Sequence, residues 1–364
     1  MKILWLTENY PPQRGGMAQS CDRIIDGLRS TGVEIEIIHF TNQTGSIKRI
    51  QQQGGGLVVI PFDESEPHTL NVTWNYLRHS EPYDYIALFG GYLAMIAAPI
   101  YARWLNTPLI TFLRGNDFDT SIFTPRKRDT LQYALEESSI IFTVTDQKSE
   151  RIKQLVSNAN LHYVPNGIVL EDWEISSSEA EFAASWKKES AAGKKVLGII
   201  GQLKPKKGVR FFMEALAKTS IAEEVHLLLI GEMEERLLAE LEQLGLSYSH
   251  LQFQDRYELI KFYACCDAVV IPSFYEGMPN VMLEAGALGI PIIASDVDGM
   301  ADVIEHGVDG LLFSAGDQDA CRKQLYQFMA MDLEARKLGD ALKEKISNQY
   351  TSNHETERYK NILG

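Results

Sequence analysis

Short runs of β-branched and aromatic residues alternate with longer helical patterns along the whole chain, and this alternation limits the fold more than any other feature. It is typical of parallel sheets that helices cover on both faces. Ligands of such sheets bind at the carboxyl ends of the strands, so the loops that follow the strands are the expected functional positions. The predicted strands span residues 3–6, 35–40, 58–60, 85–89, 109–112, 140–144, 196–200, 226–230, 268–271 and 292–294.

The length of 364 residues exceeds what one ordinary core accommodates and suits two domains. The rhythm of strands restarts at residue 196, after a charged, serine-containing segment (171–195) without a strong period. We therefore predict an N-terminal domain over residues 1–170 and a C-terminal domain over residues 171–347. Residues 333–363 show a helical pattern that breaks near residues 348–353. The polar, glycine-rich segment 41–56 is predicted to be either a loop that contacts the second ligand or a disordered stretch.

Charge is unevenly distributed along the chain. Residues 1–170 contain 15 Lys/Arg against 17 Asp/Glu, and the remainder contains 20 against 32. This acidity argues against nucleic acid as the main partner, because phosphate backbones are bound by clustered Lys and Arg. Arg126, Lys127 and Arg128 follow Pro125 at a predicted helix start. They are either a solvated helix face or a weak peripheral contact with anionic lipid.

The sequence shows no sign of a metal site, a disulfide framework or a membrane span. The four cysteines have no C-x-x-C spacing, and the eight histidines are scattered, without an H-E-x-x-H motif. The apolar run at the N-terminus is too short for a signal peptide, and the uncharged stretch 86–102 is too short to span a bilayer. We expect a cytoplasmic protein without a tightly bound cofactor or metal, either free or peripheral to the inner face of the membrane.

Two carboxylates, Glu276 and Glu284, lie on either side of a predicted helix start. Between them, Gly277, Met278, Pro279, Asn280 and Val281 form a turn and the first helical residues. The first amides of a helix lack partners within the helix and favour phosphate, and carboxylates accept hydrogen bonds from sugar hydroxyls. The pattern therefore suggests a nucleotide-sugar site. The alternative is that the acids only stabilise the helix dipole.

The loop after the predicted strand 196–200 is the second candidate. It runs from Gly201 to Gly208 and contains Gln202 and Lys207. A lysine at a glycine-bounded helix entry can neutralise a diphosphate leaving group. The loop does not follow the order of a Walker P-loop, and lysines in surface turns are common.

The first half offers three further candidates. Gly15 and Gly16 precede a predicted helix and allow a ligand to approach the backbone closely, although a tight turn explains them equally well. Arg114 and Asp117 follow the strand 109–112, where they could bind a phosphate and sugar hydroxyls or form a structural pair. Asn166 lies in a Pro-Asn-Gly sequence that is most simply a turn, and it is also a candidate to line a ligand-binding cleft.

In order, these segments resemble glycosyltransferase family 4. The resemblance covers nearly the whole chain and includes residues 296–305 and 307–313. It implies the GT-B fold, which consists of two Rossmann-like α/β domains facing across a deep cleft, with a C-terminal helix (348–364) crossing back to the first domain. It also implies metal-independent transfer with retention of configuration from a nucleotide-diphosphate sugar held by the second domain to an acceptor held by the first.

The resemblance also assigns roles to residues. Glu284 would bind the donor ribose and Glu276 the transferred sugar, while Lys207 and residues 278–281 would take over the charge of the leaving diphosphate. Gly16 would approach the diphosphate from the other domain, and Asp117 would shape the sugar site. The expected catalytic residues are thus Lys207, Glu276, Asp117 and Arg114. The expected donor-binding residues are Gly15, Gly16, Asn166, Gln202, Lys207, Arg256, Glu276, Gly277, Met278, Pro279, Asn280, Val281 and Glu284.

Two positions depart from the family pattern. Gln202 stands where many relatives have an arginine, which removes a cation from the diphosphate site. Arg114 stands where many have a histidine, which suits a uronic acid donor or a phosphorylated acceptor. UDP is the expected donor nucleotide, and a glycan or lipid-linked compound of bacterial polysaccharide or lipopolysaccharide synthesis is the expected acceptor. The competing function is a sensor that binds nucleotide sugars or carbohydrates without turnover. A nicotinamide oxidoreductase lacks support because G-x-G-x-x-G is absent.

Overall fold

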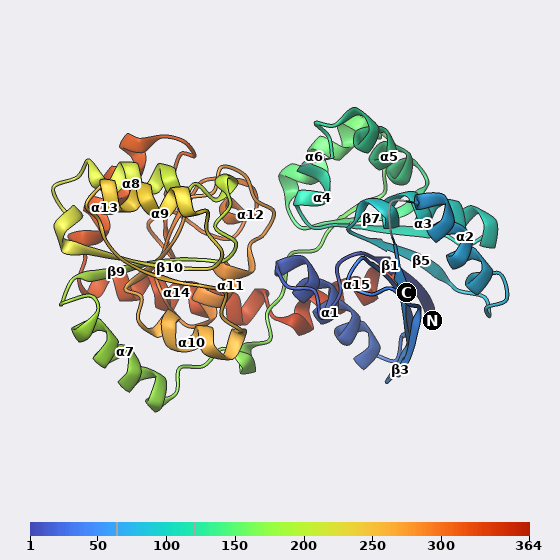
Figure 1. Cartoon of the computed structure of the whole chain (residues 1–364), viewed down its shortest axis with the longest axis horizontal. Helices are drawn as coiled ribbons and strands as arrows, with labels where there is room; N and C mark the ends of the chain where they lie inside the picture. The colour runs from blue at the N-terminus through green and yellow to red at the C-terminus, as the bar shows by residue number, and fades with distance from the viewer. Residues whose placement is uncertain (63–64, 120) are drawn as a thin grey trace. The chain divides into compact units, whose positions relative to one another are not determined.

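The computed structural model describes residues 1–62, 65–119 and 121–364, and of Asn116 and Asp117 it describes only the backbone. The chain divides into two compact units. The first comprises Met1–Asn166 and Ser352–Gly364, and the second comprises Gly167–Thr351. The chain therefore crosses between the units twice, after Asn166 and after Thr351. Each unit is an α/β structure with helices on both faces of a central sheet (Figure 1).

The first unit has an eight-stranded sheet in the order β3-β4-β2-β1-β5-β6-β7-β8, parallel except for the antiparallel β3–β4 pair. Its strands are β1 (Lys2–Thr7), β2 (Glu34–Thr41), β3 (Lys48–Gln52), β4 (Gly55–Pro61), β5 (Tyr85–Phe89), β6 (Leu109–Leu113), β7 (Ser138–Thr143) and β8 (Leu161–Tyr163). Its helices are α1 (Gly16–Ser30), α2 (Glu66–Leu77), α3 (Tyr92–Leu105), α4 (Asn116–Asp119), α5 (Pro125–Glu136), α6 (Asp146–Leu155) and α15 (Ser352–Leu363).

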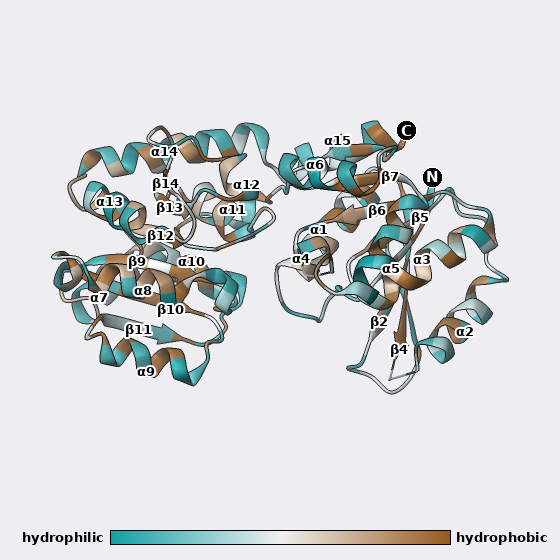
Figure 2. Ribbon diagram, turned by 90° about the horizontal axis from the view of Figure 1, so that it is seen from above, coloured by the Kyte–Doolittle hydropathy of each residue, from teal (hydrophilic) through white to brown (hydrophobic). Residues whose placement is uncertain are grey.

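Alternate residues of these strands face two separate cores. Ile3 and Trp5 pack with α1 and the C-terminal helix α15, whereas Leu4 and Leu6 belong to the core that contains α3 and α5. This period of two follows from the strand geometry, and it explains why the central strands read as continuous apolar runs. Hydrophobic residues accordingly follow the strands, and polar residues cover the outer faces of the helices (Figure 2).

The prediction that residues 41–56 lack regular structure is wrong in part. Residues 48–52 form the edge strand β3, and residues 55 and 56 begin β4. Four of the five residues of β3 are exposed. An antiparallel edge strand of this kind buries no face, so it leaves no hydrophobic alternation in the sequence.

The second unit has a six-stranded parallel sheet in the order β11-β10-β9-β12-β13-β14. Its strands are β9 (Lys195–Ile200), β10 (Val225–Ile230), β11 (Ser247–Leu251), β12 (Ala268–Ile271), β13 (Ile292–Ser295) and β14 (Leu311–Phe313). Its helices are α7 (Ser177–Glu189), α8 (Val209–Ala217), α9 (Glu235–Gln243), α10 (Arg256–Ala264), α11 (Asn280–Ala287), α12 (Asp298–Ala301), α13 (Gln318–Met329) and α14 (Leu333–Gln349). One core lies between this sheet and helices α8, α9, α13 and α14.

The segment 171–195, which the sequence marks as a domain junction without a strong period, contains α7. Ser176 begins this helix with a capping box that Glu179 completes. Ala183 is the buried residue of this helix, so the sequence of the helix shows no apolar stripe from which it could be predicted. The predicted break near residues 348–353 is present, since α14 ends at Gln349 and α15 begins at Ser352.

All four cysteines are free and buried. In the described part of the chain, every helix is too short or too polar to cross a membrane.

Candidate functional site

The order of the second sheet reverses between β9 and β12. From this pair, β10 and β11 continue in one direction and β13 and β14 in the other. Helices connecting the strands leave a gap beyond the carboxyl ends at such a switch point, which is where open α/β sheets bind ligands. The loop after β9 carries Lys206 and Lys207, and the loop after β12 carries Glu276. The sequence therefore brings two of the predicted catalytic residues, Lys207 and Glu276, to the switch point.

Lys206 and Lys207 both reach Glu276. The ammonium group of Lys207 contacts Oε1 of Glu276, and that of Lys206 lies 3.7 Å from Oε2. The Glu276 side chain is 10% exposed, whereas the two lysine side chains are 15% and 20% exposed. Two cations thus share one carboxylate at a place that solvent reaches. Lys207 is therefore placed where an incoming anion can compete with Glu276 for its charge.

Backbone contacts fix the two loops against each other. The amide of Phe274 donates to the carbonyl of Lys206 over 2.9 Å. Gly208 has φ +66°, and a Cβ at this position would lie 2.0 Å from the Pro272 carbonyl oxygen, so only glycine fits. The 3₁₀ turn Pro205–Lys207 is therefore held directly beside the end of β12.

The N-terminus of α11 follows Glu276 in the same loop. Its N-cap residue is Pro279, which has no side-chain acceptor for the first amides of the helix. The amide of Gly299 donates to the Gly277 carbonyl over 3.1 Å and so fixes the turn from the other side. The predicted donor-binding residues Gly277, Met278, Pro279, Asn280 and Val281 are thus gathered at a helix start beside the Lys206–Lys207–Glu276 group. Such a helix start favours an anion.

Glu284 lies one turn into α11 and is buried. The hydroxyl of Tyr263, on α10, donates to its Oε2 over 2.6 Å. Burial and then the charge of Glu284 raise the pKa of Tyr263 well above its usual value, so the phenol remains a donor. Sequence reasoning missed Tyr263, because nothing in the pattern of a helix separated from Glu284 by 21 residues indicates this contact.

Other predicted donor residues lie apart from this group or contact different partners. Gln202 is exposed at the start of the loop after β9. Arg256 begins α10 and forms an ion pair of 2.7 Å with Asp172. Gly15 is the N-cap of α1 with φ +116°, and Gly16 is the first residue of that helix. Both glycines belong to the first unit.

Arg114 and Asn166 contact each other inside the first unit. The Arg114 guanidinium donates to Oδ1 of Asn166, and it forms an ion pair of 2.9 Å with Glu355 on α15. The Arg114 and Glu355 side chains are each 2% exposed. The interpretation of Arg114 as a partner for a charged sugar gains no support from this geometry, because a buried carboxylate already balances its charge. The side chain of Asp117 lies outside the described residues.

A further acid at the switch point of the first sheet is Glu8, which follows β1. Its Oε1 accepts a hydrogen bond of 2.5 Å from the amide of Leu93, near the start of α3. Burial raises the pKa of Glu8, and the amides of Leu93 and Ala94 oppose that shift. Sequence reasoning noted the loop without assigning Glu8. The available signal was its place directly after a buried strand. Among the described residues, no three His, Cys, Asp or Glu side chains gather closely enough to hold a metal ion.

Comparisons with known proteins agree with this architecture. The family model of the glycosyl transferase 4-like domain matches residues 15–167, and that of the glycosyl transferases group 1 matches residues 181–345. The chain is 26% identical to the uncharacterized glycosyltransferase MJ1607 of Methanocaldococcus jannaschii over 85% of its length and 84% of the relative's. It is 25% identical to the N-acetyl-alpha-D-glucosaminyl L-malate synthase of Bacillus anthracis, over 70% and 67% of the two lengths.

Among solved structures, Anabaena Alr3699/HepE in complex with UDP and glucose superimposes with a TM-score of 0.83 at 19% identity, covering 100% of this chain and 99% of the other. A sucrose-phosphate synthase from Thermosynechococcus elongatus gives a TM-score of 0.86 at 16% identity, with 99% and 98% coverage. These likenesses confirm the predicted GT-B fold. With the two family models, they show that the chain is a glycosyltransferase of the family 4 type.

Proposed function

We propose that this glycosyltransferase transfers a hexose or a uronic acid, with retention of configuration, from a nucleotide-diphosphate sugar to a glycan or lipid-linked acceptor. Bacterial polysaccharide or lipopolysaccharide synthesis is the proposed setting. The observation that carries the proposal is the convergence of Lys206 and Lys207 on Glu276, beside the start of α11. A diphosphate needs cations and amides at one place, and a sugar needs carboxylates nearby.

The proposed donor complex follows from this arrangement. The diphosphate would lie against the first amides of α11 and take up the charge of Lys207, which releases Glu276 from its ion pair to accept hydroxyls of the transferred sugar. Glu284, which Tyr263 orients through its Oε2, would accept the ribose hydroxyls. A carboxylate has enough lone pairs for both tasks. Tyr263 would thus orient the group that binds the ribose.

The proposed chemistry needs no enzymic nucleophile. The bond between the sugar C1 and the diphosphate oxygen breaks, and the acceptor oxygen forms its bond to C1 on the same face. The acceptor proton passes to the departing phosphate oxygen, and Lys207 stabilises the charge that develops there. No metal takes part in this scheme. Trapping the enzyme during turnover tests it, because a covalent sugar adduct on Glu276 or another carboxylate would refute it.

UDP is the proposed donor nucleotide. The structure of Anabaena HepE with UDP and glucose supports this choice, because that structure matches this chain over its whole length. A thermal-shift screen across UDP-, GDP- and ADP-sugars tests it, because a donor that binds the folded protein raises the melting temperature. A shift with GDP- or ADP-sugars alone would contradict the choice of UDP.

The second candidate function is a sensor of nucleotide sugars that lacks turnover. Its support is Gln202, which supplies no charge where many relatives have an arginine. The neighbouring pair Lys206 and Lys207 favours the enzyme, because two cations already face the site. Donor hydrolysis or transfer measured with several acceptors separates the two functions. Donor binding without any product would favour the sensor.

We propose that the protein is cytoplasmic and that its first unit makes a weak peripheral contact with anionic lipid at the inner face of the membrane. Phe123 is 86% exposed just before α5, and Arg126, Lys127 and Arg128 follow it on the exposed part of that helix. An apolar side chain beside three cations suits an anionic bilayer surface. Co-sedimentation with phosphatidylglycerol vesicles tests the contact. Binding that survives Phe123→Ser with Arg126→Ser would contradict it.

A further inference from the structure

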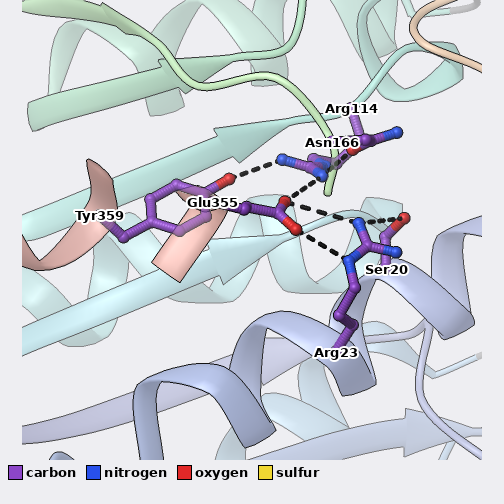
Figure 3. A network of polar contacts seen from close by, with 6 residues as sticks. All are labelled: Ser20, Arg23, Arg114, Asn166, Glu355 and Tyr359. Atoms are coloured by element: carbon purple, nitrogen blue, oxygen red, sulfur yellow. Dashed lines mark hydrogen bonds and ion pairs between the residues drawn. The ribbon is translucent and has the colours of Figure 1, made fainter. Parts of the chain in front are cut away.

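One guanidinium group in the first unit contacts two segments that lie far from it in the sequence (Figure 3). Arg114, which directly follows β6, donates through one terminal nitrogen to the Tyr359 hydroxyl over 2.6 Å. Its other terminal nitrogen donates to Oε1 of Glu355 over 2.9 Å and to Oδ1 of Asn166. Since Glu355 and Tyr359 lie on α15, Arg114 connects the end of β6, the C-terminal helix and residue 166.

These partners stand at the two places where the chain crosses between the units. Asn166 is the last residue of the first unit before the first crossing, and Glu355 lies in the first turn of α15, directly after the second crossing. Within the second unit the crossing segments also meet, because the amide of Ile168 donates to the Tyr350 carbonyl over 2.9 Å and Ile168 pairs with Thr351. The two crossing segments are therefore joined twice. In the first unit Arg114 contacts both of them, and in the second unit they pair directly with each other.

Charge and geometry fit this role better than a role in donor binding. Oε2 of Glu355 accepts a hydrogen bond of 2.8 Å from Nε of Arg23 on α1, so Glu355 balances two guanidinium groups. A donor carboxylate would have to displace buried Glu355 to reach Arg114. A planar guanidinium can hold three acceptors in fixed directions, which a histidine at this position cannot do.

The loop that Arg114 begins is also held at its far end. Lys148, on α6, is fully buried and donates to the Gly115 carbonyl over 3.4 Å and to Oδ2 of Asp119 over 2.9 Å. Residues 115–119 therefore run between two buried ion pairs. Arg114 thus links the crossing segments to the start of this loop.

We propose that Arg114 is a positioning residue that fastens both interunit crossings to the end of β6 and thereby sets the backbone of residues 115–119. This proposal rests on the proposed function only for its effect on turnover, where Asp117 would shape the sugar site. The fastening itself is a property of the fold. Its consequence is that loss of Arg114 loosens the crossings and slows transfer of neutral and carboxylated sugars alike.

Hydrogen exchange of the full chain tests the fastening without any substrate. Arg114→Met is expected to speed exchange of the Ile168 amide and of the first amides of α15 by about tenfold or more, because bonds to a charged group are lost. Asn166→Ala removes a single contact and is expected to affect Ile168 more than α15, whereas Tyr359→Phe should affect α15 more. Arg103→Met is the matched control, since Arg103 is an exposed arginine of the same unit. Unchanged exchange in both single-contact variants would overturn the proposal.

Turnover gives the second readout. With UDP-glucose and UDP-glucuronic acid as donors, Arg114→Met is expected to lower kcat by the same factor for both and to leave the KM ratio of the two donors unchanged. Arg114→Lys keeps the charge but not the three directions, so it is expected to restore only part of kcat. Loss confined to UDP-glucuronic acid would overturn the positioning role. If the wild type transfers from no donor, the proposed function fails while hydrogen exchange still decides the fastening.

Discussion

The carboxyl edges of the two sheets use charge differently. In the first unit, Arg114 is balanced by Glu355, and Lys148 by Asp119, with side chains that are 0–8% exposed. In the second unit, two lysines that are 15% and 20% exposed both contact Glu276. Buried, hydrogen-bonded ion pairs fix a backbone, whereas an ion pair that solvent reaches can exchange one anion for another. The comparison teaches that the ion pairs of the first edge hold the fold together, whereas those of the second edge have the solvent access that the proposed phosphate binding requires.

Removal of one cation from the second edge is expected to have the largest effect. Lys207→Ala should lower kcat by about 10²- to 10³-fold, the usual loss when one group that stabilises developing charge is removed. Steady-state transfer from the donor found in the thermal-shift screen measures it. Lys204→Ala is the matched control, because Lys204 is an exposed lysine of the same loop. An equal loss in both variants would show that the loop needs only its overall charge.

Breaking a buried pair at the first edge should affect stability instead of phosphate binding. Glu355→Gln leaves Arg114 and Arg23 without their carboxylate, and we expect it to destabilise the first unit by about 3 kcal/mol. Arg114→Met should cost less, since Glu355 retains Arg23. Native-state hydrogen exchange of amides in β1 and β5 measures this separately from the second unit. The comparison breaks down if Arg114→Met is the more destabilising variant.

The two edges also differ in how well their functional residues could be predicted from the sequence. Lys207 and Glu276 could be predicted because each lies in the loop after a buried strand, and the parallel sheet brings such loops together. Arg114 was recognised as a charged residue after a strand, but its partner is 241 residues away on α15, and no local pattern indicates that contact. Tyr263 was missed for the same reason. The exposed strand β3 was missed because it buries no face.

A hydroxyl at the second edge offers a smaller test. Tyr263→Phe removes the donor to Glu284, and we expect donor affinity to fall by about tenfold because a buried carboxylate loses a hydrogen bond. Isothermal titration with UDP measures it. Tyr248→Phe is the control, since the Tyr248 hydroxyl reaches Glu242 over 3.4 Å on an exposed surface. Weaker UDP binding in Tyr248→Phe as well would point to a general loss of packing.

The smallest expected effect is a change in the pH dependence of stability, which arises from one buried histidine in each unit. Burial lowers the pKa of His39 in β2 and of His226 in β10. The charge of Lys194 lowers the pKa of His226 further. Both histidines are therefore favoured as neutral rings in the folded state. A lowered folded pKa gives stability that is complete above the unfolded value of about 6.5 and is lost as pH falls through the folded value.

The free energy of unfolding of each half of the molecule should consequently fall below about pH 6.5, by about 1 kcal/mol per histidine. Hydrogen exchange at pH 7.5 and pH 5 compares the units directly. His226 has a serine hydroxyl at each ring nitrogen, 2.8 Å and 2.9 Å away, so His226→Gln keeps a polar side chain that does not titrate. This variant should flatten the pH dependence of the second unit and leave that of the first unchanged. If both units keep their wild-type pH dependence, carboxylates rather than the buried ring account for the acid sensitivity of the second unit.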